Sequence, residues 1–108
     1  MNYGFIRSAC ASPRLKVADC RYNSEQIINA ARLAAKNGAM LIVFPELCIS
    51  GYSCGDLFFQ ESLQKGCVAA LEMIAHKTAS LDALIVLGLP LAKDGVLFDC
   101  AVFLYKGD

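Results

Sequence analysis

The stretch that decides the fold is MLIVFPE, residues 40–46. Residues 40–44 are apolar at every position, which is typical of a strand that is covered on both faces. Pro45 ends this strand, since proline cannot donate a ladder hydrogen bond. Glu46 follows at once and is the only carboxylate in an otherwise apolar run. We therefore expect a buried strand of an α/β sheet, with a glutamate at its carboxyl end.

The residues that precede this strand predict one strand and one helix. Residues 5–11 (FIRSACA) favour a strand that ends before Pro13. Residues 23–37 favour a helix, because apolar side chains recur there at helical spacing. Asn23 is expected to cap this helix, with a glutamine three residues later, and Gly38 is expected to end it.

The residues that follow the strand of residues 40–44 predict one helix and two strands. Residues 46–56 are interrupted by glycines and favour a loop, after which residues 61–79 carry a helical apolar stripe. Residues 83–89 and 96–105 favour strands that a turn joins into a hairpin. The order is therefore β-α-β-α-β-β, which indicates the α/β class with parallel pairing and right-handed crossovers.

Two helices and a four-stranded sheet leave two possible arrangements. The helices lie on opposite faces, as in flavodoxin-like folds, or they share one face and leave the other bare. We expect the second arrangement, in which later chain or a partner supplies the missing layer. A bare apolar sheet face is a large patch of a kind that soluble monomers avoid.

Composition excludes several classes of function. The chain has 108 residues, which suits one domain or part of one, and 56% of them are hydrophobic. Ten basic residues balance ten acidic ones, so no strong field favours nucleic acid or an anionic membrane. No apolar run is long enough to span a bilayer, and the first residues lack the features of an export signal. We expect a cytoplasmic protein.

The chain has six cysteines and one histidine, His76. No Cys-x-x-Cys pair occurs, so the sequence does not predict a zinc site, and we expect no bound metal. The cysteines fall within apolar patterns, where a thiol acts as a small buried hydrophobe. We expect reduced structural thiols rather than disulfides.

Glu46 has two interpretations from its position alone. Ligands bind at the carboxyl edge of open α/β sheets, and a partly desolvated glutamate there has a raised pKa and can act as a base. Most loop carboxylates, however, point into water, and position alone favours that second interpretation.

A resemblance to a known family favours the interpretation of Glu46 as a base. Residues 44–47 (FPEL) followed by 50–52 (SGY) resemble the first signature of the nitrilase, or carbon–nitrogen hydrolase, superfamily. Four further segments are similar to the N-terminal glutaminase domain of bacterial glutamine-dependent NAD synthetases: residues 3–7 (YGFIR), 51–58 (GYSCGDLF), 88–91 (GLPL) and 97–102 (LFDCAV). The resemblance covers essentially the whole chain, and the ordered set of segments is more specific than any one of them.

The resemblance implies a fold and a mechanism. The fold is the N-terminal portion of the αββα sandwich, so residues 1–108 form an incomplete glutaminase domain. The family uses a Glu-Lys-Cys triad, in which the cysteine forms a thioester with the substrate and ammonia leaves. Glu46 matches the general base, and Tyr52 matches an aromatic residue of the glutamine pocket. No position in this chain matches the family's lysine or nucleophilic cysteine.

The resemblance also implies partners and cofactors. They are glutamine and the rest of a longer parent chain. The bare sheet face separately predicts a homo-oligomer, and the balanced charge predicts no nucleic-acid or membrane partner. The domain itself needs no cofactor, and ATP and Mg belong to a separate synthetase domain. Asp99 stands where the family usually has asparagine, and the sequence assigns it no role. Two alternatives stay open: another nitrilase-type amidase, or a self-sufficient flavodoxin-like binding module.

Overall fold

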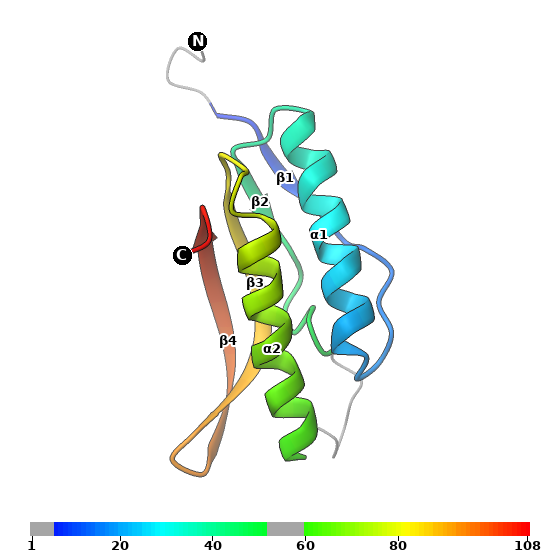
Figure 1. Ribbon diagram of the computed structural model, residues 1–108, viewed down its shortest axis with the longest axis vertical. Coiled ribbons are helices and arrows are strands. Elements are labelled where there is room, and N and C mark those ends of the chain that lie inside the picture. The colour runs from blue at the N-terminus through cyan, green and yellow to red at the C-terminus, as the bar shows by residue number, and fades with distance from the viewer. Residues whose placement is uncertain (1–5, 52–59) are drawn as a thin grey trace.

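The computed structural model describes residues 6–51 and 60–108, which form one sheet and two helices (Figure 1). In chain order the elements are β1 (Ser8–Cys10), α1 (Cys20–Lys36), β2 (Leu41–Val43), α2 (Glu61–Lys77), β3 (Leu84–Lys93) and β4 (Val96–Tyr105). The predicted order β-α-β-α-β-β and the α/β class are confirmed. The first two strands are shorter than predicted, whereas β3 extends four residues further, as far as Lys93.

The strands lie in the order β1-β2-β3-β4. The first three are parallel, and β3 pairs with β4 in an antiparallel hairpin, as predicted. Asp94 and Gly95 form the tip of the hairpin and both have positive φ, 53° and 76°. Such a pair suits a two-residue turn whose twist matches that of the strands.

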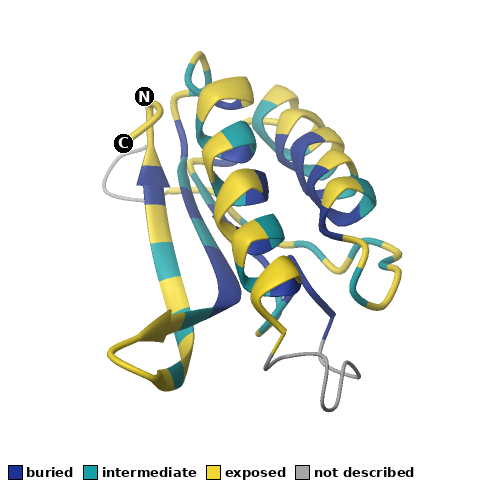
Figure 2. Ribbon diagram, turned by 60° about the horizontal axis from the view of Figure 1, so that its bottom comes forward, coloured by how far each residue is buried: buried dark blue, intermediate teal, exposed yellow. Residues whose placement is uncertain are grey.

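Both helices lie side by side on one face of the sheet (Figures 1 and 2). Side chains alternate along β3, so Ile85, Leu87 and Leu89 face the helices and are almost fully buried. They pack in the same core as Ile27 of α1 and Ile74 of α2. The alternative of a flavodoxin-like module is therefore wrong, since it requires a helix on each face.

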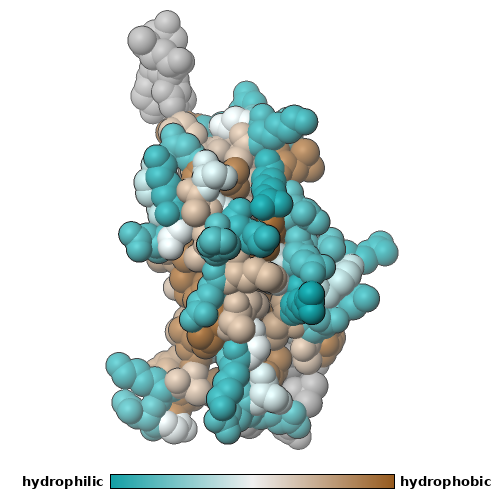
Figure 3. Space-filling view, in the orientation of Figure 1, coloured by the Kyte–Doolittle hydropathy of each residue, from teal (hydrophilic) through white to brown (hydrophobic). Residues whose placement is uncertain are grey.

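The opposite face of the sheet carries apolar side chains, and neither helix of the described residues covers it. Leu84 and Val86 of β3 alternate with the core residues and are half-buried. Their register partners on β4 are Tyr105 and Phe103, and Phe103 is 62% exposed. We call this surface the open face. The helix face, by contrast, mixes hydrophilic side chains with hydrophobic ones between them (Figure 3).

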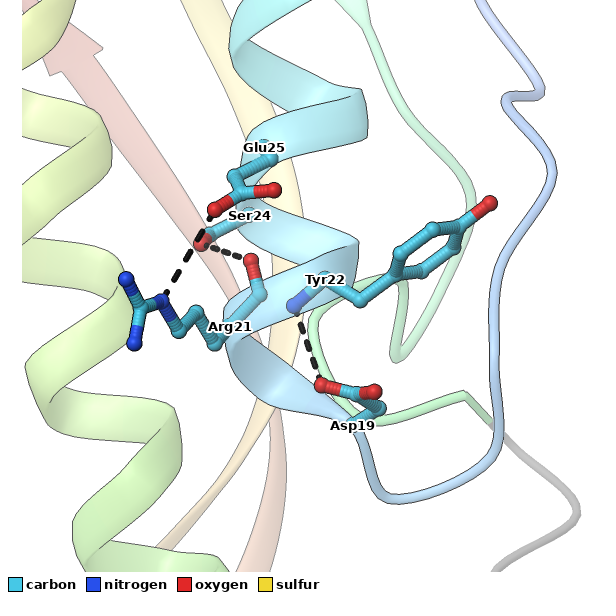
Figure 4. A network of polar contacts seen from close by, with 5 residues as sticks. All are labelled: Asp19, Arg21, Tyr22, Ser24 and Glu25. Carbon is cyan, nitrogen blue, oxygen red and sulfur yellow. Dashed lines mark hydrogen bonds and ion pairs between the residues drawn. The ribbon is translucent and has the colours of Figure 1, made fainter.

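The start of α1 differs from the prediction. Asp19 caps the helix, because its Oδ1 accepts a hydrogen bond of 3.0 Å from the backbone N–H of Tyr22 (Figure 4). Asn23 lies one turn inside the helix and is fully buried. Its amide donates to the carbonyls of Lys16 and Ile49, both at 2.8 Å, and its Oδ1 accepts from the Lys16 N–H. Asn23 therefore joins α1 to the segment after β2 instead of capping the helix.

The second helix begins at Glu61 with Gln60 at the cap position, without a side-chain capping bond. Asp56, which the sequence favours as the residue that introduces this helix, lies outside the described residues. Within the described part of the chain, no helix is long and apolar enough to cross a membrane.

Candidate active site

Glu46 lies in a short excursion of the chain at the carboxyl end of β2. The Phe44 N–H donates to the Val86 carbonyl at 2.8 Å, and the Ile49 N–H donates to the Gly88 carbonyl at 3.2 Å. Residues 45–48 lie between these two bonds and leave the plane of the sheet. Leu47 adopts a positive φ of 53°, which turns the chain back. The backbone thus places Glu46 at the strand edge where α/β folds bind ligands.

Gly88 makes this excursion possible. A Cβ atom at Gly88 would lie 2.5 Å from the backbone nitrogen of Leu47 and 3.1 Å from the Cα of Glu46. Because side chains alternate along the regular β3–β4 ladder, that missing Cβ points to the open face. The backbone of Glu46 therefore crosses the sheet on the open face, in direct contact with β3.

Asp99 of β4 lies close to Glu46. It is the register partner of Pro90, two residues beyond Gly88, and it points to the same face. Asp99 raises the pKa of the Glu46 carboxyl, first as its hydrogen-bond partner and then as a like charge, with desolvation as the smallest cause. The direction predicted for the pKa of Glu46 is confirmed. Desolvation, the predicted cause, contributes least, because Glu46 is exposed in this chain and a second carboxyl group dominates.

Sequence reasoning missed Asp99 as the partner of Glu46. Fifty-three positions separate the two residues, and only the pairing of β4 with β3 brings them together. One feature of the sequence could have drawn attention to Asp99: it is an aspartate at a position where the family usually has asparagine.

We expect the substitution Asp99→Asn to shift the titration of Glu46 to lower pH. It removes the like charge and one of the two acids that share a proton. NMR detection of the Glu46 side-chain carboxyl across a pH series measures this shift. A carboxyl with a raised pKa in the folded state stabilises the fold below its unfolded pKa, and this contribution is lost as pH rises through the folded pKa. The variant should therefore lose less stability than the parent as pH rises through the folded-state pKa of Glu46.

The matched control for this prediction is Asp94→Asn. Asp94 lies in the hairpin turn between β3 and β4, so the change removes one negative charge of the hairpin without removing the partner of Glu46. A titration of Glu46 that stays the same in Asp99→Asn and in the control would contradict the proposed carboxyl pair.

The cysteine nearest to Glu46 in sequence is not a nucleophile in this structure. Cys48 is fully buried, and its Sγ donates to the Gly88 carbonyl at 3.6 Å. Burial raises the pKa of the Cys48 thiol, which disfavours the reactive thiolate. Its predicted packing role is confirmed. Tyr52, the residue matched to the glutamine pocket, lies outside the described residues.

The described residues, 6–51 and 60–108, contain no cluster of three or more His, Cys, Asp or Glu side chains that could hold a metal ion. The five cysteines among them form no disulfide. The candidate site thus consists of one carboxyl pair at the edge of an apolar open face. Such a pair can hold or accept a proton, but the described residues supply no nucleophile beside it.

Comparisons with known proteins place the chain in a family. The carbon-nitrogen hydrolase family matches residues 6–108. The chain is 33% identical, over 97% of its length, to the glutamine-dependent NAD(+) synthetase of Mycobacterium tuberculosis, of which it covers 16%. The protein therefore belongs to the carbon-nitrogen hydrolase family, as its resemblance to the nitrilase superfamily implied.

Solved structures agree with this assignment. A glutamine-dependent NAD(+) synthetase from Cytophaga hutchinsonii is 28% identical and superposes with a TM-score of 0.87 over 94% of this chain and 17% of that one. An amidase from Nesterenkonia sp. shares the fold at 23% identity, with a TM-score of 0.80 over 95% of this chain and 40% of its own. The chain thus resembles the glutaminase domain of NAD synthetases, and it spans less than a fifth of those synthetases.

Proposed function

We propose that this chain is the N-terminal part of the glutaminase domain of a glutamine-dependent NAD synthetase. The observation that carries the proposal is Glu46, held on the open face at the end of β2 in a chain that matches such synthetases over almost its whole length. The domain would hydrolyse glutamine and supply ammonia for NAD formation. The carbon-nitrogen hydrolase family supports the reaction class, and the synthetase relatives support the substrate.

In the proposed reaction a cysteine thiolate attacks the amide carbon of glutamine. Glu46 takes the thiol's proton and passes it to the leaving nitrogen as the carbon–nitrogen bond breaks, which releases ammonia and leaves a thioester. Water hydrolyses the thioester to glutamate. A lysine stabilises the oxyanion, as a positive charge beside developing negative charge does. The raised pKa of Glu46 suits a base that must exchange a proton near neutral pH.

The triad is incomplete within these 108 residues. No position in them matches the family's lysine or cysteine, so both belong to further chain in this proposal, as does the synthetase domain with its ATP and Mg. The rest of the parent chain is thus the first partner. Glutamine-supported and ammonia-supported NAD formation by the full-length protein test the proposal, since both should occur if the domain is a glutaminase. Synthesis from ammonia alone would refute the assignment.

A second candidate is a nitrilase-type amidase with a different amide substrate. The shared fold with the Nesterenkonia amidase supports it. The same full-length protein, assayed for ammonia release from short aliphatic amides and from glutamine, separates the two candidates. Hydrolysis of the aliphatic amides without that of glutamine would favour the second.

We predict that the 108-residue chain by itself releases no ammonia from glutamine. It holds the proposed base but neither the lysine nor the nucleophile, and hydrolysis without a nucleophile loses most of the rate enhancement. An enzyme-coupled ammonia assay measures this, with the full-length protein as the positive control. Ammonia release above the buffer background would show that a cysteine of this chain acts as nucleophile.

We predict that the isolated 108-residue chain forms a homo-oligomer through the open face. Exposed Phe103 and its half-buried neighbours make an apolar surface that water disfavours. Light scattering over a range of concentrations should give a mass above 11.6 kDa. Phe103→Lys should lower that mass, whereas Leu33→Lys, at an exposed leucine of α1, should leave it unchanged. A monomer at all concentrations would contradict the prediction.

A further inference from the structure

Two thiols meet between the helices, away from Glu46. Cys20 is the first residue of α1, and Cys67 lies in the middle of α2. Their sulfur atoms are 3.6 Å apart, and both side chains are buried. The other three described cysteines lie elsewhere: Cys10 and Cys100 on strands and Cys48 beside Gly88.

Gly66 of α2 lies beside Cys20 where the two helices meet. A Cβ atom at Gly66 would lie 3.8 Å from the Cβ of Cys20 and 3.6 Å from its sulfur, in ordinary contact. The start of α1 thus lies beside α2 with room for one methyl group between Cys20 and the Gly66 backbone. The contact between the two sulfur atoms places the Cys20 and Cys67 side chains next to each other, as a disulfide requires. The sulfur atoms must approach from 3.6 Å to about 2 Å, which rotation of the two side chains provides.

Cys20 also has the features of the reactive partner. It lines a cavity of about 590 Å³ together with Asp19, Leu63 and Gly66, whereas Cys67 is fully buried. Its place in the first turn of α1 exposes it to the positive end of the helix dipole, which favours a thiolate. The hydrogen bond with Cys67 lowers the pKa of Cys20, although burial and the Asp19 charge oppose this change.

We propose that Cys20 and Cys67 form a peroxide-oxidisable dithiol that closes to a disulfide between α1 and α2. The Cys20 thiolate attacks one oxygen of hydrogen peroxide, the O–O bond breaks, and Cys20 becomes a sulfenic acid while water leaves. Cys67 then attacks the Cys20 sulfur, the S–O bond breaks, and a second water leaves. The two thiols are oxidised to one disulfide, and one peroxide is reduced to two waters.

The bond would close a loop that contains the candidate site. Residues 20 to 67 include β2 and Glu46, and the first turn of α1 already holds the segment after Glu46 through the Asn23 bond to Ile49. A disulfide restricts the unfolded chain more when the loop that it closes is long. The oxidised form should therefore unfold at a higher temperature than the reduced form.

Peptide mapping of the full-length protein tests the proposal. The reduced protein is treated with hydrogen peroxide, blocked with an alkylating agent and digested with trypsin without reduction. We expect a cross-linked pair of peptides, residues 17–21 (VADCR) and 66–77 (GCVAALEMIAHK), whose mass is about 2 Da below the sum of the two. Dithiothreitol should abolish it. The readout is the cross-link, so it is independent of glutaminase activity.

The variants make the test specific. Cys20→Ser and Cys67→Ser should each lose the cross-link, and Cys10→Ser, at an exposed cysteine of β1, should keep it. Peroxide treatment in denaturing guanidinium should give much less of it than treatment of the native protein, a comparison that needs no variant. Irreversible oxidation of Cys20 without the cross-link, pairing of Cys20 with another cysteine, or equal yields in guanidinium would overturn the proposal.

Discussion

Glu46→Gln in the full-length protein should lower glutamine-supported NAD formation by about 100-fold or more, the range for loss of a positioned general base. Glutamine keeps the size of the side chain and its place over Gly88, but it cannot take the thiol's proton. Ammonia-supported synthesis should not change, since ammonia bypasses hydrolysis of the amide. The measurement is the rate of NAD formation with each nitrogen source, at saturating ATP and dinucleotide precursor.

Glu72→Gln is the matched control for this substitution. Glu72 is a glutamate of α2, remote from the open face, and its change to glutamine should leave both rates at the parent level. If Glu46→Gln retained glutamine-supported synthesis, Glu46 would not be the base. If it also lost ammonia-supported synthesis, the defect would lie in folding rather than in the proposed proton transfer.

Gly88→Ala should destabilise the protein by about 3 kcal/mol, within the range for overpacking of a close backbone contact. The added Cβ would lie 2.5 Å from the Leu47 nitrogen, and that neighbour is backbone, which cannot rotate away. The segment of residues 45–48 must shift, so Glu46 should also lose its position beside Asp99. Thermal unfolding measures the first effect, and the glutamine-supported rate measures the second.

Gly66→Ala, by contrast, should stabilise the same protein. Its Cβ would meet only the Cys20 side chain, at 3.6 and 3.8 Å, inside a helix. Replacing a helical glycine by alanine, where the added methyl group makes only ordinary contacts, stabilises by about 0.5–1 kcal/mol. Equal melting temperatures for the two variants would show that the contact at Gly88 carries no strain, and the close approach of the Glu46 backbone would then not require a glycine.

Much of the architecture follows from local sequence patterns. Three features depend on neighbours in the chain, so periodicity and turn chemistry predict them: the apolar run before Pro45, a helix predicted over residues 61–79 and observed over 61–77, and the turn at Asp94 and Gly95. Glu46 was also found from local features, as a carboxylate directly after a buried strand. The resemblance to the carbon-nitrogen hydrolases then gave its proposed role.

Other features depended on contacts between distant residues. Asparagine is a residue type that often caps helices. The Asn23 amide instead donates hydrogen bonds to the carbonyls of Lys16 and Ile49, and Asp19 caps the helix. No local pattern reports where those carbonyls lie. The placement of both helices on one face was likewise a choice between two arrangements that the same periodicity allows.

The sequence by itself determined the order of elements, the family resemblance and the candidate base. The folded chain alone shows that Asp99 contributes more than desolvation to the raised pKa of Glu46, and that Gly88 leaves room for the Glu46 backbone. The physical reason is the same in both cases. Each effect acts over a few ångströms between residues more than forty positions apart, and pairing of β3 with β2 and β4 creates that proximity.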